Sequence, residues 1–150
     1  MRKKQIWSFF VVRKPTKTKG KNYQISYTIN RTFNKSNYAR MEVNVKIDFN
    51  RKDSLLVIQI DEEIDHHAVE TIRRRADYEI QRYMPKRVVL DFDHVSFMDS
   101  SGIGMIVGRY KLISMLGGKL VMRNVKENLQ KILDMSGVTK IIPLEQSKVN

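Results

Sequence analysis

The chain has 150 residues, 41% of them hydrophobic, which is enough for one domain with a single core. It contains no cysteine, so disulfides, thiolate nucleophiles and cysteine metal sites are excluded, as suits a reducing cytoplasm. The formal net charge is +12, but residues 1–40 contain eleven Lys or Arg and no Asp or Glu. Residues 41–150 are almost balanced, so the basic character belongs to the first 40 residues.

Residues 1–40 show no regular hydrophobic period. The apolar run at 5–12 is shorter than the roughly 20 apolar residues that span a bilayer, and no signal-peptide cleavage site follows it. We predict a disordered basic leader. Three interpretations stay open: a tail for a membrane surface or nucleic acid, an inert extension, or, as we favour, a start codon assigned too early, with the protein beginning at Met41.

From Met41 the chain alternates predicted strands and helices. Residues 43–49 alternate apolar and polar side chains, and a polar turn joins them to a second strand at Leu55–Ile60 as an N-terminal β-hairpin. Asp65 is a suitable N-cap for the next helix, which Pro85 ends. Its apolar positions recur at spacings of three or four: Val69, Ile72, Ala76, Ile80 and Tyr83.

We expect no ligand site at the two polar clusters of this helix. His66 and His67 face different directions and lack a third ligand at a fixed spacing, so we expect surface histidines and no metal site. Residues 73–75 are three successive arginines with acids close by, which favours a solvated helix face over a phosphate site.

The central stretch is a turn from a strand to a helix. The apolar run at 88–90, after Arg87, predicts a buried strand, and Asp91 and Asp93 after it indicate a loop or a partner-binding edge. Helical spacing returns after Asp99–Gly102, at Ile103, Ile106, Val107, Tyr110 and Ile113. The serines of this turn therefore fall at the N-cap or first turn, where backbone N–H groups and the helix dipole favour an anion.

The remaining elements complete an α/β domain. Gly117–Gly118 ends the central helix, Lys119–Arg123 is a strand, and a short helix runs from Val125 or Lys126 to Met135. We place the last strand at Ile141–Ile142, before Pro143. The prediction is a single domain over residues 41–150, with a mixed central sheet of about five strands and helices packed on it.

Several segments resemble one known family. Residues 97–104, continued by 108–111, are similar to the phosphorylation segment of the bacterial anti-sigma factor antagonists, the STAS domain family. Three further segments resemble that family in the same order: 65–67, 117–118 and 134–142. The resemblance extends over about residues 41–146 and implies the STAS fold. Family members usually continue into another C-terminal helix, which we expect to be missing or reduced to a turn here.

The resemblance implies a phosphorylation switch in the cytoplasm. The family's phosphoacceptor is the second serine of its motif, here Ser101. The unphosphorylated protein would bind an anti-sigma factor that is itself a serine kinase, and so release a sigma factor for sporulation transcription. Phosphorylation by that kinase would break the complex, and a protein serine phosphatase would restore it. The residues assigned to partner or kinase binding are Asp99, Ser100, Gly102, Asp65, His66 and Arg109.

Other readings of these residues stay open. Ser and Asp are ordinary helix caps, and a STAS-like switch could serve a stress-response sigma factor instead. A nucleotide-binding enzyme is disfavoured, because residues 99–102 lack the leading glycine of a nucleophile elbow and the glycines at 102–108 lack a phosphate-loop ending. We therefore expect no catalysis, cofactor or metal, no direct DNA binding and no membrane span.

Overall fold

The structure, a computed structural model, describes residues 44–146. The leader predicted for residues 1–40 and the expected strand residue Val43 lie outside this range. In chain order the elements are β1 (Val45–Asn50), β2 (Leu55–Ile60), α1 (His66–Tyr83), β3 (Arg87–Asp91), α2 (Ser100–Met115), β4 (Lys119–Arg123), α3 (Glu127–Ser136), the 3₁₀ helix η2 (Val138–Lys140) and β5 (Leu144–Glu145).

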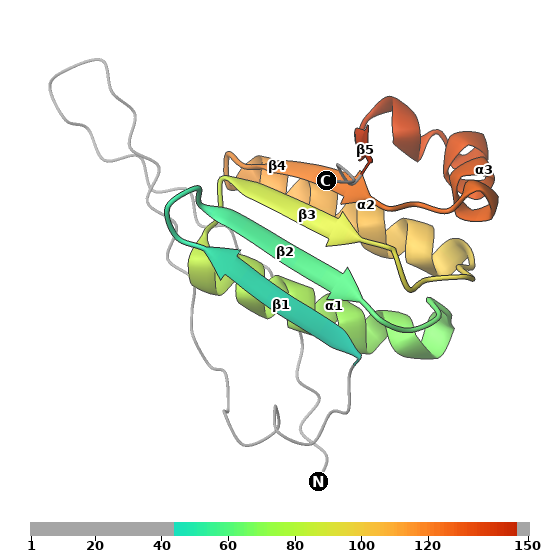
Figure 1. Ribbon diagram of the computed structural model, residues 1–150, viewed down its shortest axis with the longest axis horizontal. Helices are drawn as coiled ribbons and strands as arrows, with labels where there is room; N and C mark the ends of the chain where they lie inside the picture. The colour runs from blue at the N-terminus through green and yellow to red at the C-terminus, as the bar shows by residue number, and fades with distance from the viewer. Residues whose placement is uncertain (1–43, 147–150) are drawn as a thin grey trace, which may run out of the picture. The chain divides into compact units, whose positions relative to one another are not determined.

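The five strands form one mixed sheet in the order β1-β2-β3-β4-β5. Strand β1 is antiparallel to β2, and the pairs from β2 to β5 are parallel. Helices α1 and α2 lie on the same face of the sheet, and α3 lies at the end of the sheet formed by β4 and β5 (Figure 1). The predicted five-stranded mixed sheet and N-terminal hairpin are confirmed.

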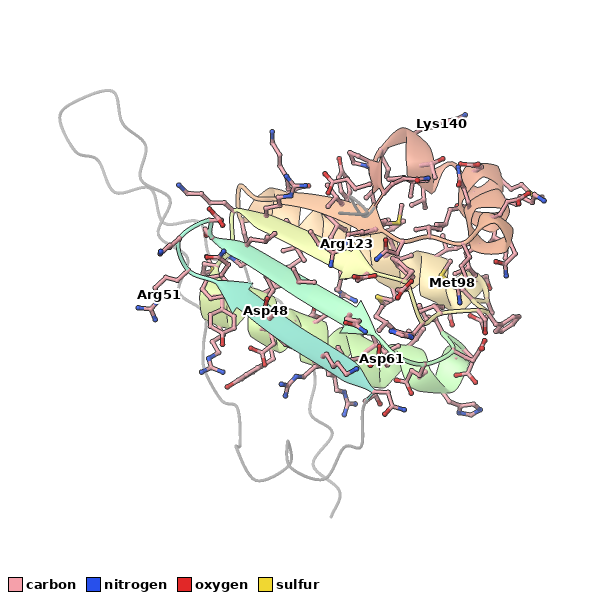
Figure 2. The ribbon with its side chains drawn as sticks, viewed as in Figure 1. Asp48, Arg51, Asp61, Met98, Arg123 and Lys140 are labelled. Carbon is pink, nitrogen blue, oxygen red and sulfur yellow. The ribbon has the colours of Figure 1, made fainter. Side chains whose placement is uncertain are left out.

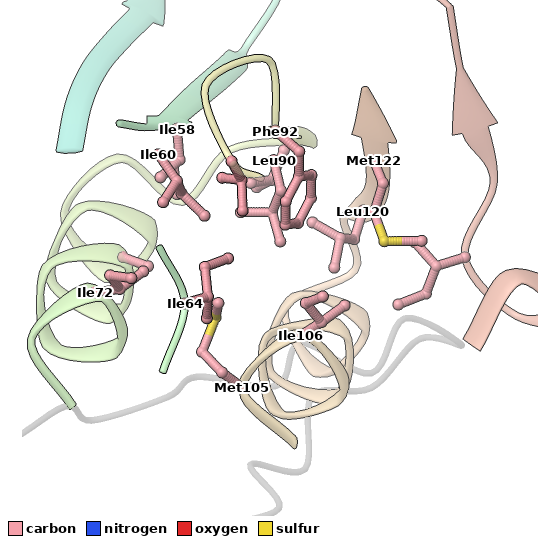
Figure 3. Close-up of a cluster of buried hydrophobic side chains, with 14 of the residues drawn as sticks. Ile58, Ile60, Ile64, Ile72, Leu90, Phe92, Met105, Ile106, Leu120 and Met122 are labelled. Atoms are coloured by element: carbon pink, nitrogen blue, oxygen red, sulfur yellow. The ribbon is translucent and has the colours of Figure 1, made fainter. Parts of the chain in front are cut away.

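The core lies between the sheet and these two helices. Figure 3 shows side chains of the sheet, such as Ile58 and Leu90, facing Ile72 of α1 and Ile106 of α2. All four side chains are fully buried. Burial of one such side chain contributes about 1.5–3 kcal/mol, which is why the alternating strands and the apolar helix stripes are held together.

Both ends of α1 follow from local sequence. Asp65 is extended and caps the first turn, and Met84 adopts the left-handed conformation (φ 47°) that ends the helix directly before Pro85. The ring of Tyr83 stacks on Phe49 with centroids 4.1 Å apart, which attaches β1 to the end of α1. The predicted apolar face is confirmed, with Ile72, Ala76 and Ile80 buried.

The position predicted for the last strand is wrong. Residues 141–142 belong to a turn, and β5 is the pair Leu144–Glu145. The backbone N–H groups of Ile141 and Ile142 both donate to the Val138 carbonyl, so they are used in the turn that closes η2. Pairing with β4 begins at the Pro143 carbonyl, which accepts from the Met122 N–H at 3.0 Å.

Candidate functional site

Helices α1 and α2 begin side by side. The loops before them meet in a short parallel bridge between Ile64 and Met98. The Ile64 N–H donates to the Phe97 carbonyl at 3.0 Å, and the Asp99 N–H donates to the Ile64 carbonyl at 3.1 Å. Both helices therefore start at the end of the sheet where β2 and β3 terminate, near Met98 in Figure 2. Two helix N-termini, each with partial positive charge, thus share one surface.

An aspartate caps each of these helices. Asp65 Oδ1 accepts from the backbone N–H groups of His67 (2.9 Å) and Ala68 (2.8 Å). Asp99 Oδ1 accepts from the Ser101 N–H at 2.8 Å. Short polar side chains at these positions accept hydrogen bonds from N–H groups that the helix itself leaves unpaired. The helices begin here because Asp65 and Asp99 supply these acceptors.

Ser101 is in the first turn of α2, half-buried, and its hydroxyl donates a hydrogen bond to Asp99 Oδ1. This hydroxyl is the main reason that the pKa of the Asp99 carboxyl lies below its usual value. Burial opposes this shift, and the backbone N–H groups of Ser101, Gly102 and His66 add to it. Asp99 is therefore an anionic acceptor for the Ser101 hydroxyl. Ser100 is exposed beside it.

The two other residues expected at α1 and α2 differ in accessibility. His66 is exposed in the first turn of α1, beside Asp99. Gly102 is buried, and a Cβ added there would lie 2.4 Å from Met98 Cγ and 2.8 Å from Ile64 Cγ2. The glycine is needed because the helix start approaches the bridge closely, and its role is packing beneath the site.

The structure does not bring Arg109 to this surface. Its side chain is buried between α2 and α1, where Nε lies 2.7 Å from Asp77 Oδ1 and Nη2 donates to Oδ2 at 3.2 Å. The Nε contact lacks hydrogen-bond alignment, so it is an ion pair. Arg109 therefore joins two helices, about ten residues along α2 from Asp99.

The acidic residues near the site have different roles. Asp91 is buried, pairs with Arg123 at 2.7 Å and accepts from the Asp93 N–H, so it stabilises the end of β3. Asp93 is exposed. Burial, and then the charge of Asp65, raises the pKa of Glu62. Of the three, it is the exposed Asp93 that gives the surface near the helix starts a negative charge.

No group of three or more His, Cys, Asp or Glu side chains within residues 44–146 is arranged to hold a metal ion. In the same range, no helix combines the length and apolar character that crossing a bilayer requires.

Sequence reasoning overlooked Phe97 as a surface residue. The sequence indicates Phe97 only as part of the motif at 97–104, whereas in the structure its side chain is 53% exposed immediately before the helix start. A large apolar side chain in a polar loop, two residues before an N-cap, was the available signal.

Comparisons with known proteins find a matching domain family and several relatives. Residues 46–149 match the STAS domain. An anti-sigma F factor antagonist of Paenibacillus polymyxa is 38% identical over 108 residues, 72% of this chain and 92% of the relative. An anti-sigma-B factor antagonist of Bacillus subtilis is 28% identical over 68% of this chain and 92% of the relative.

Solved structures show the same arrangement. The anti-sigma factor antagonist SpoIIAA in its unphosphorylated form has a TM-score of 0.60 and 27% identity, covering 70% of this chain and 89% of that one. The phosphorylated form of SpoIIAA, described as a Bacillus cell fate determinant, has a TM-score of 0.56 at the same identity, covering 70% and 92%. This fold thus occurs in a protein with and without phosphate.

Proposed function

Because the chain belongs to the STAS domain family, we propose that it is an anti-sigma factor antagonist controlled by phosphorylation of Ser101. Its unphosphorylated form binds an anti-sigma factor that is a serine kinase, and this binding releases a sigma factor for sporulation transcription. The kinase phosphorylates Ser101 and ends the interaction, and a protein serine phosphatase restores it. The protein works in the cytoplasm as a binding partner without catalysis of its own.

The hydrogen bond from the Ser101 hydroxyl to Asp99 carries this proposal. It holds a nucleophilic oxygen on a carboxylate acceptor, in the first turn of a helix whose start lies on the surface. Phosphoryl transfer to a hydroxyl needs a group that accepts its proton and a position that tolerates the product's charge. Asp99 supplies the first, and the helix N-terminus supplies the second.

The same geometry explains how phosphate could end binding without unfolding the domain. A phosphoserine carries about −1.5 to −2 charges at pH 7, here added next to the carboxylate of Asp99. The helix N-termini stabilise this charge while water surrounds it. Docking of a partner removes that water, so repulsion from Asp99 and the cost of desolvation both increase. Phosphorylation therefore weakens binding and leaves the fold intact.

Intact-mass spectrometry tests the proposal. The full chain is incubated with ATP and the anti-sigma F factor of Paenibacillus polymyxa, whose antagonist is 38% identical. We expect wild type to gain one phosphate, Ser101→Ala to gain none, and Ser100→Ala to behave as wild type. If Ser101→Ala still gains a phosphate, the phosphorylated residue is not Ser101. A parallel reaction with the anti-sigma factor's own antagonist checks that the kinase is active. If that antagonist is phosphorylated and the wild-type chain is not, the proposal that this anti-sigma factor phosphorylates the chain is refuted.

A second sigma pathway is a defined alternative. The Bacillus subtilis relative antagonises the anti-sigma-B factor, and at 28% identity it is also a homologue. This alternative keeps the Ser101 switch and changes the partner to that of a stress response. Binding measured in parallel to the two anti-sigma factors decides between them: tighter binding to the anti-sigma F factor supports the sporulation pathway, and the reverse order supports the other.

A further inference from the structure

Strand β1 leaves one edge of the sheet open. It is the outermost strand, and no strand in the described part of the chain lies beyond it (Figure 1). The Asp61 N–H donates to the Asn44 carbonyl at 2.7 Å, which fixes how the backbone groups alternate along β1. Val45, Ile47 and Phe49 therefore direct their N–H and C=O groups away from β2. These groups form a row of donors and acceptors along the outer edge of β1.

Natural proteins usually protect such an edge from pairing. They do so with proline, a β-bulge, a very short strand or charged side chains. Strand β1 contains no proline, has six residues and pairs with β2 in one continuous register over its whole length. Of these devices it has charge alone, and its two charged residues, Lys46 and Asp48, have opposite signs. Opposite charges on one strand attract or repel a second strand according to the register in which the two pair.

The two faces of β1 differ in chemistry. Val45, Ile47 and Phe49 are half-buried and pack against the core on the side of the helices. Lys46 and Asp48 are exposed on the opposite face. Residues directly opposite each other in an antiparallel pair lie on the same face, so a strand that pairs with β1 must supply apolar and charged residues in the same alternation. Strand β1 of a second copy has this alternation.

Pairing β1 with β1 of a second copy brings opposite charges together in one register. When Ile47 lies opposite Ile47 of the second copy, each Lys46 lies opposite an Asp48. Val45 then lies opposite Phe49, so the residues with outward backbone groups face each other, as hydrogen bonding requires. A slip of two residues, the smallest that keeps these hydrogen bonds, places Lys46 opposite Lys46 or Asp48 opposite Asp48, and like charges there are unfavourable. Charge therefore selects a single, symmetric register.

Both charged side chains are accessible to a second copy. Lys46 forms an ion pair with Asp61 at 2.7 Å, yet its side chain is 73% exposed. Asp48 is exposed on the strand (Figure 2) and forms no ion pair within residues 44–146. An exposed acid without a cation, beside an open strand edge, has room for the lysine of a second copy.

We infer that β1 is the contact surface between two copies of this chain, whose β1 strands pair antiparallel and join the two sheets into one. The pairing has two-fold symmetry and about six backbone hydrogen bonds. The contact is narrow, so the dimer is weaker than one with a broad apolar interface.

The pairing leaves the surface around Ser101 free. Helix α1 packs on β1 and β2, and α2 packs on β4, so α2 lies on the far side of α1 from the open edge. Ser101, in the first turn of α2, therefore remains accessible in the dimer. The dimer is thus independent of the proposed phosphorylation switch.

Sedimentation equilibrium of the full chain over a series of concentrations tests the dimer. We expect the mean mass of wild type to rise from one chain towards two. Asp48→Lys places lysine opposite lysine at both charged pairs, so the dissociation constant increases about tenfold or more. Asp93→Lys is the matched control, because it makes the same change of charge at an exposed acid outside the strands and leaves the dissociation constant close to that of wild type. Circular dichroism checks that each variant is folded.

A mixture of two variants tests the register. Lys46→Asp has two acids in β1 and Asp48→Lys has two lysines, so each pairs poorly with itself. In the mixed dimer every charge lies opposite one of the other sign, so we expect it to form at concentrations where neither variant dimerises alone. The double variant Lys46→Asp/Asp48→Lys pairs with itself again. A wild-type dimer that Asp48→Lys weakens no more than Asp93→Lys would overturn the inference, as would a wild type that is monomeric at every concentration.

Cross-linking is a second test, and it changes no charge. Ile47→Cys introduces the only cysteine of the chain, at the centre of the inferred pairing. The two Cα atoms would lie about 5.5 Å apart, within the range of a disulfide. We expect oxidised glutathione to link Ile47→Cys into dimers on a non-reducing gel. Val45→Cys is the control, because its two copies lie roughly 13 Å apart in this register, and equal linking of both variants would contradict the register.

Discussion

Arg109 of α2 and Asp77 of α1 form an ion pair between the two helices, with Nε 2.7 Å from Oδ1. Only 8% and 18% of the two side chains are exposed. Burial raises the pKa of Asp77 and lowers that of Arg109, so for both groups desolvation exceeds their mutual attraction. Such a pair adds little net stability, but either charge left alone in the same place is costly.

Replacement of Arg109 by methionine should therefore destabilise the domain. Arg109→Met leaves the Asp77 carboxylate buried without its partner, and we expect the free energy of unfolding at pH 7 to fall by about 3 kcal/mol. Urea denaturation measures this. The double variant Asp77→Leu/Arg109→Met, which removes both charges, should recover most of the loss; equal loss in both variants would mean that packing, not charge, is responsible.

The deficit of Arg109→Met should also depend on pH. The pKa of Asp77 is already raised by burial, with Arg73 and Glu70 as further nearby charges, and it rises more without Arg109. A carboxyl whose pKa is higher in the folded state favours folding at low pH, and this contribution is lost as pH rises through the folded pKa. The deficit therefore shrinks as pH falls from 7, and the double variant shows no such recovery.

Local signals explain what the sequence could predict. Asp65 and Asp99 act on N–H groups two or three residues away, so both helix starts can be found from neighbours alone. The alternation of apolar and polar residues in β1 and the apolar residues spaced three or four apart in α1 are also local signals. In both elements the burial of the side chains follows the sequence pattern. The position of Ser101 in the first turn of α2 was predictable for the same reason.

Contacts between distant segments explain what it could not. Arg109 and Asp77 are 32 residues apart on different helices, so nothing near Arg109 signals that its charge is neutralised within the fold. The last strand begins at Leu144, not at the predicted Ile141, because the N–H groups of Ile141 and Ile142 are hydrogen-bonded in the turn that closes η2. Phe97 stays exposed because its backbone is fixed by Ile64, a residue of another loop.

The cap of α1 gives a second stability prediction. Asp65→Ala removes the acceptor for two N–H groups, and we expect a loss of about 1 kcal/mol in the free energy of unfolding, measured by urea denaturation. Asp65→Asn keeps an acceptor oxygen and most of the stability. Asp93→Ala is the control, because Asp93 is an exposed acid outside any helix. Similar losses of stability in Asp65→Ala and Asp93→Ala would mean that the loss of a negative charge, not the loss of the helix cap, is responsible.

A negative charge at Ser101 should leave the fold intact. In Ser101→Asp the new carboxylate lies at the start of α2, where the helix dipole favours it, so the thermal midpoint stays close to that of wild type. The Asp99 carboxyl loses the hydroxyl that lowers its pKa and gains a like charge, so its pKa rises. NMR titration of Asp99 in wild type and Ser101→Asp measures this shift.

The reason for the shift decides how stability responds to acid. In wild type the lowered pKa of Asp99 gives a contribution to stability that is present above the unfolded value and is lost as pH falls through the folded pKa. In Ser101→Asp this contribution is reduced, so the two proteins differ less at low pH than at neutral pH. A domain that melts on introduction of the aspartate would contradict a switch that acts on binding alone.

Two glycines of α2 should respond to alanine in opposite directions. At Gly102 a Cβ would lie 2.4 Å from Met98 Cγ, so Gly102→Ala displaces the bridge beneath the site and costs about 1–3 kcal/mol. At Gly104 a Cβ meets open space, so Gly104→Ala stabilises the helix by about 0.5–1 kcal/mol. Urea denaturation of both variants compares the same chemical change two residues apart in one helix. Stabilisation by both would mean that Met98 and Ile64 move aside readily, and the close packing of the two helix starts would then not fix the position of Ser101.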